Sequence, residues 1–178
     1  FVLVFCGRLG AVLLKLLIIF LKKRVMTNRL MRLSVVEQSK LIKRKKITPT
    51  EMVEAAIASI EDLNPTLNAV TIKMYDEARK NAKSVDSSKP FAGVPLLLKD
   101  LSAHYAGAAF TGGSKYLEGY ISGHDSELVK RYKDAGFIVC GKTNTPEFGL
   151  QPTTEPKKDG PTRNPWDIKE SVQKKLGA

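Results

Sequence analysis

The feature that most constrains the fold is a short apolar run, Val94–Leu98, which ends in Lys99 and Asp100. The run is too short and too uniformly apolar for a surface helix, so it predicts a buried strand. Such a strand would carry Lys99 into a dry environment. Because desolvation disfavours an ammonium group, a buried lysine has a lowered pKa and can activate a hydroxyl nucleophile. For these residues alone, a strand that ends in a solvated Lys-Asp turn is the more common explanation.

A strong helix start precedes this strand. Thr48 supplies a capping hydroxyl, Pro49 suits the first helical position, and Glu51 stands three residues after the cap. Apolar residues then recur at helical spacing as far as Asn64 and Pro65, which we expect to close the helix.

Further elements are expected on both sides of the helix. A short helix is predicted at residues 35–42, where it ends in the basic run 43–46, because cations favour a helix C-terminus. Another helix is predicted from Ile72 to Lys83, followed by a polar linker at residues 84–90.

A strand, a helix and a second strand are expected after the linker. Ser126 with Asp125 can cap a helix, Gly136 marks the following turn, and Phe137–Cys140 is apolar enough for a second buried strand. This order predicts a parallel pair in a layered sheet, with Cys140 as a small core residue. The fold class is therefore α/β, and one domain accounts for residues 33–171.

The basic charge of the chain is unevenly distributed. The net charge is +11, and residues 1–50 hold twelve Lys and Arg against one acidic residue, Glu37. Residues 51–178 hold seventeen basic and seventeen acidic side chains. A nucleic-acid-binding domain should carry its positive charge on the folded surface that docks, so we expect no nucleic-acid partner.

The first 25 residues form a separate segment. Residues 1–21 are apolar apart from Arg8 and Lys15, and basic residues follow at 22–24. Two interior charges make a membrane span unfavourable. We expect residues 1–25 to be translated upstream sequence, with Met26 as the natural start and a cytoplasmic location. The alternative is membrane association through residues 1–24.

Several motifs follow the apolar run in a fixed order and reveal a resemblance. They are Thr111-Gly112-Gly113-Ser114, Asp125 before a helix that ends at Ala135-Gly136, Gly141-Lys142-Thr143-Asn144-Thr145-Pro146-Glu147-Phe148, and Gly160-Pro161-Thr162-Arg163-Asn164-Pro165-Trp166-Asp167. In this order they resemble the N-terminal part of an enzyme of the amidase signature family, over residues 34–171 and most densely over 93–167. The resemblance implies the incomplete N-terminal part of a layered α/β/α fold with a mixed sheet.

The resemblance also implies a catalytic role for Lys99. Enzymes of this family hydrolyse carboxylic amides with a Ser-Ser-Lys triad, and Lys99 matches the lysine of that triad. In relatives, a glycine-serine loop with the bridging serine follows the Asn-Pro-Trp segment, and the nucleophilic serine comes later. Ser171 matches the residue just before that loop, and residues 172–178 diverge. We expect a truncated amidase that is inactive as given.

Other residues receive supporting roles. The resemblance implies that Ser114, Thr143 and Asn144 line the site, although the glycine-rich turn at Ser114 is equally well explained as a simple chain reversal. Asp100 is expected to hold Lys99 in place or to cap a turn. Gly112 and Gly113 are expected to shape the loop before Ser114.

No cofactor is expected. His104 and His124 have no cysteine or carboxylate set at metal-ligand spacing around them, so we predict no metal site. The chain has no phosphate-binding loop and no dinucleotide fingerprint. The expected partner of the complete enzyme is a small-molecule amide whose identity, like the oligomeric state, stays open.

Two other functions stay open beside the amidase. One is the glutamine amidotransferase subunit of the same family, which acts with misacylated tRNA. The resemblance favours it less, because residues 149–155 and 160–167 are more similar to stand-alone amidases. The other is a small basic membrane-associating protein in which residues 1–46 carry the function.

Overall fold

The computed structural model describes residue 27 and residues 29–171. The regular elements are, in chain order, α2 (Val35–Lys43), α3 (Pro49–Leu67), β1 (Val70–Lys73), α4 (Tyr75–Ser84), β2 (Pro95–Lys99), η1 (Lys115–Leu117), α5 (Glu127–Ala135), β3 (Ile138–Thr143), η2 (Glu147–Gly149), β4 (Arg163–Asn164) and β5 (Asp167–Ser171). The predictions for residues 1–25 and 172–178 lie outside the described residues. Among the helices that are described, none combines the length and the apolar character needed to cross a bilayer.

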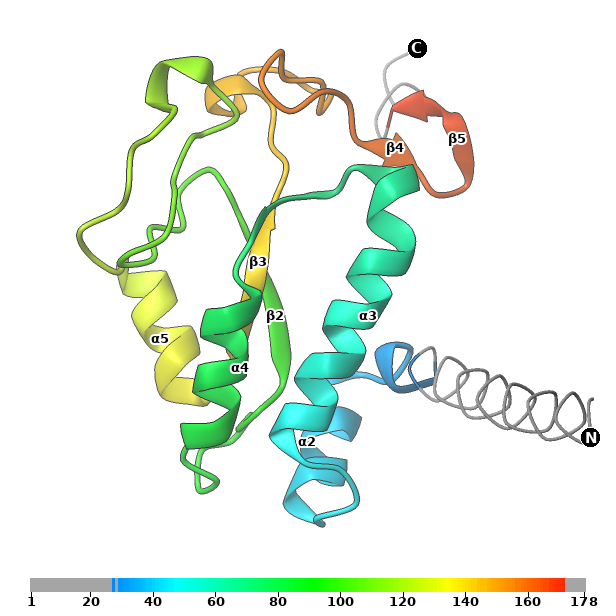
Figure 1. Ribbon diagram of the computed structural model, residues 1–178, viewed down its shortest axis with the longest axis vertical. Helices are drawn as coiled ribbons and strands as arrows, with labels where there is room; N and C mark the ends of the chain where they lie inside the picture. The colour runs from blue at the N-terminus through cyan, green and yellow to red at the C-terminus, as the bar shows by residue number, and fades with distance from the viewer. Residues whose placement is uncertain (1–26, 28, 172–178) are drawn as a thin grey trace, which may run out of the picture.

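The central sheet has the strand order β1-β3-β2. β2 runs parallel to β3, as predicted for the strand-helix-strand unit, while β1 is antiparallel to β3. The sheet is therefore mixed, and the α/β fold class is confirmed. β4 and β5 form a separate two-stranded ladder beside the C-terminal end of α3 (Figure 1).

The helix starts follow the sequence signals closely. Thr48 caps α3, with its hydroxyl accepting from Glu51 N–H at 3.2 Å and Glu51 Oε2 accepting from Thr48 N–H at 2.8 Å. Ser34 and Glu37 form the same reciprocal arrangement at α2. Two hydrogen-bond donors that the helix leaves unpaired are satisfied in each case, which is why these starts are readable from sequence.

Two predicted boundaries are wrong. Helix α3 continues through Pro65 to Leu67, because a proline this close to the C-terminus forfeits little of the helical ladder. The chain turns at Asn68, whose φ of 49° is left-handed. The helix predicted at Ile72–Lys83 begins only at Tyr75, since Val70–Lys73 pairs with β3. Sheet pairing overrides the local helical pattern there.

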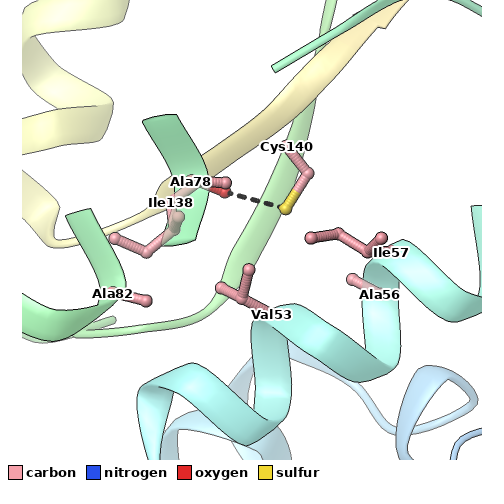
Figure 2. Packing of buried hydrophobic residues seen from close by; sticks show 7 residues of the cluster. All are labelled: Val53, Ala56, Ile57, Ala78, Ala82, Ile138 and Cys140. Carbon is pink, nitrogen blue, oxygen red and sulfur yellow. Dashed lines mark hydrogen bonds between the residues drawn. The ribbon is translucent and has the colours of Figure 1, made fainter. Parts of the chain in front are cut away.

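Helices cover the sheet on two faces. On one face, α3 and α4 pack against Ile138 and Cys140 of β3. Figure 2 shows this cluster, in which the Cys140 thiol points toward the Ile138 carbonyl oxygen at 3.7 Å. Burial raises the pKa of the Cys140 thiol to about 12, so it is an inert core group. On the other face, Val129 of α5 packs with Leu98 and Val139.

A register shift decides which strand residues face which layer. Leu96 lies opposite Val139, whereas Leu97 lies opposite Gly141, so Cys140 is an extra residue in β3. Such a bulge reverses the alternation of side chains after it. As a result Lys142, the partner of Leu98, shares the α5 face with Leu98.

Candidate active site

The candidate site lies at the carboxyl ends of β2 and β3, where the loops that follow the two strands gather (Figure 1). Lys99 is the last residue of β2 and pairs with Thr143, the last residue of β3. The next residue, Asp100, donates its backbone N–H to the Thr143 carbonyl at 3.1 Å. The sheet therefore brings together Lys99, Asp100, Thr143 and Asn144, which come from two segments far apart in sequence.

Lys99 is exposed, and the expectation that it is buried is wrong for this structure. β2 is an edge strand, and the face that carries Lys99 also carries Leu97, which is 37% exposed. The apolar run predicted burial on both faces, but the described residues cover only the Leu98 face at this end. Among the described residues, Lys99 is therefore not in the dry environment that the apolar run predicted.

The buried lysine is Lys142, with a side chain that is 0% exposed. Its ammonium donates to the Ala109 carbonyl at 2.8 Å and to Asp100 Oδ1 at 3.3 Å. Its nitrogen lies 5.1 Å from the centre of the Phe110 ring. Burial lowers the pKa of Lys142, and the attraction of Asp100 opposes that shift.

Asp100 serves the neighbouring loop rather than Lys99. Its carboxylate accepts from the Thr111 backbone N–H at 3.0 Å and from the Thr111 hydroxyl at 2.7 Å. With Lys142 on its other oxygen, this nearly inaccessible carboxylate is satisfied on both sides. Asp100 was expected either to hold Lys99 in place or to cap a turn. The structure does not show the first role, because the Asp100 side chain binds Thr111 instead.

The glycine-rich loop after Thr111 is fitted tightly against the segment after β3. Gly113 has a φ of +70°, and a Cβ there would stand 2.5 Å from the Thr145 carbonyl oxygen. The loop thus needs glycine for both its conformation and its close approach. Gly112 accepts a hydrogen bond from Phe148 N–H at 2.8 Å through its carbonyl.

Ser114 is buried and bound rather than free to react. Its hydroxyl donates to Glu147 Oε1 at 2.6 Å and accepts from Tyr116 N–H at 3.2 Å. It is 1% exposed. The hydroxyl therefore ties the glycine-rich loop to the Glu147 segment.

Asn144 joins the end of β3 to the later part of the chain. Its side-chain amide donates to the Gly160 carbonyl at 2.9 Å and to the Thr162 hydroxyl oxygen at 3.1 Å. The Thr162 hydroxyl donates in turn to the Asn68 carbonyl at 2.8 Å. Asn144 thus fixes the position of the backbone at Gly160. The carbonyl of the half-buried Thr143 accepts the hydrogen bond from Asp100 N–H.

Several positioning residues were missed by reasoning from sequence. Lys142, Thr111 and Glu147 lie inside the motifs without a predicted role, and the sequence alone indicates only a turn at Asn68. The Asn68 side-chain amide in fact donates to the Asp159 carbonyl at 2.7 Å. The only sequence signal for Lys142 is its position two residues after the predicted buried strand at Phe137–Cys140.

His104 and His124 stack on each other with ring centres 5.0 Å apart, and His104 also stacks on Phe110 at 4.0 Å. Within residues 27 and 29–171, no group of three or more side chains with suitable donors is arranged to hold a metal ion. His104 therefore packs against two rings, and one of them, Phe110, also lies near the Lys142 ammonium group.

Comparisons with known proteins agree with the motif order. The family model described as Amidase matches residues 51–172. The 6-aminohexanoate-cyclic-dimer hydrolase of Paenarthrobacter ureafaciens is 45% identical over 137 residues, which are 76% of this chain and 27% of that protein. The lipoamidase of Enterococcus faecalis is 39% identical over 135 residues, covering 75% of this chain and 19% of the lipoamidase.

The solved structures support the same relationship. The structure of 6-aminohexanoate cyclic dimer hydrolase complexed with substrate superposes with a TM-score of 0.76 at 43% identity, over 79% of this chain and 29% of that one. A bacterial aryl acylamidase of the amidase signature family superposes with a TM-score of 0.72 at 34% identity, over 79% of this chain and 31% of that one. The chain thus spans less than a third of the length of these relatives. It belongs to the amidase signature family.

Proposed function

We propose that the chain carries the lysine-bearing part of a carboxylic-amide hydrolase that uses a Ser-Ser-Lys triad, with Lys99 as the general base. One observation carries the proposal: in a chain of this family, Lys99 ends β2 at the point where the Thr111–Ser114 loop and the residues after β3 converge. Strand ends that are rigidly tied to loops hold a catalytic group in a defined place.

The proposed chemistry follows from the properties of a neutral amine. Lys99 accepts a proton, through the bridging serine, as the nucleophilic serine attacks the amide carbonyl carbon. It then returns a proton to the departing amine nitrogen. Two hydroxyl partners are needed, and neither has a counterpart among the residues that the resemblance matches. The chain as given is therefore proposed to be inactive toward amides.

The exposure of Lys99 is consistent with this inactivity. The proposed proton transfer needs a site from which bulk water is excluded, and the described residues leave Lys99 open to solvent. To act as a base it needs a covering layer that removes this water. The proposed enzyme therefore requires polypeptide beyond the described residues both for the hydroxyl groups and for desolvation.

The proposal is tested in a chimera. The matched stretch of the Paenarthrobacter ureafaciens cyclic-dimer hydrolase is replaced by the corresponding residues of this chain, and hydrolysis of simple aryl and alkyl amides is measured. We expect the chimera to be active and Lys99→Ala to lower its kcat/KM by at least about 100-fold, the usual scale for a lost general base.

The matched control is Lys115→Ala, which removes another exposed lysine close to the glycine-rich loop and is expected to leave the rate within about twofold. The purified 178-residue chain is assayed alongside and is expected to show no turnover. Retained activity in the Lys99→Ala chimera, or turnover by the purified chain alone, would contradict the proposal.

A second candidate is an amidotransferase component. The glutamyl-tRNA(Gln) amidotransferase subunit of Methylacidiphilum infernorum is 35% identical over 139 residues, covering 78% of this chain and 28% of that protein. Assays of chimeras built with each relative would distinguish the two candidate functions. Glutamine-dependent ammonia release without hydrolysis of simple amides would favour the amidotransferase.

A further inference from the structure

Four consecutive basic residues, Lys43, Arg44, Lys45 and Lys46, form the turn that follows α2. We call residues 43–46 the basic turn. All four side chains are exposed, and within the described residues none of them forms an ion pair. Like charges held this close together repel one another, so a negatively charged partner would stabilise the turn.

The basic turn is anchored to the body of the protein on both sides. Ile42 and Ile47 flank it in sequence, and both are buried in one apolar cluster with Val94. In α2 itself, the Ser39 hydroxyl donates to the Pro90 carbonyl at 2.7 Å. The four charges are therefore presented by a folded surface and not by a loose tail.

The backbone of the turn closes the helix in a defined way. Lys46 N–H donates to the Leu41 carbonyl at 3.0 Å, and Lys45 N–H donates to the Ile42 carbonyl at 2.9 Å. Lys45 has a left-handed φ of 55°, in a position after a helix where glycine is favoured. The chain thus carries a cation where the backbone alone would favour a residue without a side chain.

The charge around the turn is concentrated at one end of the molecule. Residues 29–50 hold seven basic residues against one acidic residue, Glu37. Glu37 and Glu51, the nearest acidic residues before and after the turn, each accept from the hydroxyl that caps their own helix. Figure 1 shows α2 at the opposite end of β2 and β3 from the loops of the candidate site.

The composition of this surface fits a lipid headgroup layer better than a nucleic acid. Residues 29–49 contain no aromatic side chain on which a base could stack. Three of the four residues in the turn are lysines, which lack the planar fork of arginine for paired contacts with phosphate. Val36, which is 52% exposed, shares a face of α2 with Lys40 and Lys43. An aliphatic group beside cations suits the boundary between headgroups and acyl chains.

We propose that the basic turn, with Val36 and Lys40 of α2, docks on the surface of a membrane that contains anionic phospholipids. Contact at this end leaves the loops after β2 and β3 facing the solution (Figure 1). Each basic residue close to such a surface strengthens binding about fivefold. The docking is peripheral and does not depend on the role of Lys99.

The test is a vesicle sedimentation assay with the 178-residue chain. Vesicles of phosphatidylcholine alone are compared with vesicles in which part of this lipid is replaced by phosphatidylserine. Both present acyl chains, so the difference between them isolates the effect of charge. We expect at least about tenfold stronger binding to the anionic vesicles, and a loss of that difference at high salt because salt screens exposed charges.

A matched pair of variants locates the contact. The first replaces all four residues of the basic turn with glutamine and is expected to weaken binding to anionic vesicles at least about 50-fold. The second removes the same number of positive charges from exposed lysines elsewhere and is expected to stay within about threefold. Its substitutions are Lys80→Gln, Lys83→Gln, Lys115→Gln and Lys130→Gln. All the replaced side chains are exposed, so circular dichroism should show that both variants fold.

A second measurement uses the unmodified chain. Anionic vesicles are expected to protect Lys43, Lys45 and Lys46 from an amine-reactive reagent, while Lys80 and Lys83 stay reactive. The proposal is overturned if all five lysines react alike on the vesicles, or if the two variants weaken binding equally. It is also overturned if binding does not distinguish anionic from neutral vesicles. Tighter binding of the turn to single-stranded or duplex nucleic acid than to the vesicles, at the same salt, would replace the membrane with a nucleic-acid partner.

Discussion

Two lysines in neighbouring strands have opposite environments. Lys142 in β3 is inaccessible and bound to Asp100 and the Ala109 carbonyl, whereas Lys99 at the end of β2 is exposed. The strands are parallel, and the two lysines are one register step apart. The difference comes from the covering of each face: α5 and the loop around Ala109 close over one, and the described residues leave the other open.

A buried charge is therefore not by itself a sign of catalysis. Lys142 has the desolvation expected of a catalytic base, yet both of its contacts hold loops in place. Lys99, the proposed base, is left uncovered by the described residues. In the described part of the chain the structural lysine is dry, and the candidate catalytic lysine is in contact with water.

Removing the charge of each lysine should give the largest difference in the free energy of unfolding. Lys142→Met keeps an aliphatic side chain of similar length but leaves Asp100 buried without its counter-ion, which is expected to cost about 3–5 kcal/mol in the free energy of unfolding. Lys99→Met changes an exposed residue and should cost less than about 0.5 kcal/mol. Urea denaturation followed by circular dichroism measures both. Equal losses would show that the two environments are not different.

The next contrast concerns the other partner of Asp100. Thr111→Val removes the hydroxyl that donates to the carboxylate at 2.7 Å, and we expect a loss of about 1.5–3 kcal/mol, as for other hydrogen bonds to charged groups. Thr66→Val, on the exposed surface of α3, is the matched control and should stay within about 0.5 kcal/mol. A similar stability of the two variants would argue against a structural role for the Asp100 cluster.

A local contact gives a smaller effect than the buried network. Thr48→Ala removes the α3 cap and is expected to cost about 1 kcal/mol. Thr66→Ala, in the same helix but away from its N-terminal cap, should be neutral or slightly stabilising because alanine favours a helix. A cap variant that lost more stability than Lys142→Met would reverse the proposed ranking of local and long-range contacts.

The smallest effect expected is a pH dependence around His104. Burial lowers the pKa of His104, with further lowering by His124 and Lys142. Folding therefore favours the neutral ring, so its contribution to stability is present above the usual histidine pKa of about 6.5 and is lost as the pH falls below it.

Between about pH 7 and pH 5, which spans that pKa, the wild-type chain should accordingly lose more thermal stability than His104→Phe, which keeps the aromatic stack with Phe110. His124→Phe removes a neighbouring charge and should reduce the loss only partly. The midpoint of thermal unfolding at the two pH values measures the difference. The assignment fails if wild type and His104→Phe show the same pH dependence.

Local signals in the sequence predicted much of the fold. The capping residues at Thr48 and Ser126, and Gly136 with a φ of 94°, act within a few residues of themselves, and their elements begin or end where expected. The parallel pair of β2 and β3 was also predictable from the strand-helix-strand order. In contrast, β1 depends on pairing with a strand far along the chain, at Ile138–Thr143, and the local pattern at residues 72–73 favours a helix instead.

The candidate site was predicted only in part for a related reason. The motif residues were identified, but their contacts depend on the bulge at Cys140, which directs Lys142 toward the Leu98 face. No pattern in the sequence indicates that bulge. The burial of Lys99 was predicted from an apolar run, and a run cannot show whether another layer covers its outer face.

Selective amine labelling tests the contrast between the two lysines most directly. The 178-residue chain and the hydrolase chimera are each treated with a limiting amount of an amine-reactive reagent, and the modification of each lysine is followed by mass spectrometry. We predict that Lys99 is modified as fast as other exposed lysines in the 178-residue chain, that Lys142 stays unmodified, and that Lys99 becomes protected in the chimera. The assigned environments are contradicted if Lys142 reacts as readily as Lys99 in the folded chain, or if Lys99 stays fully reactive in the chimera.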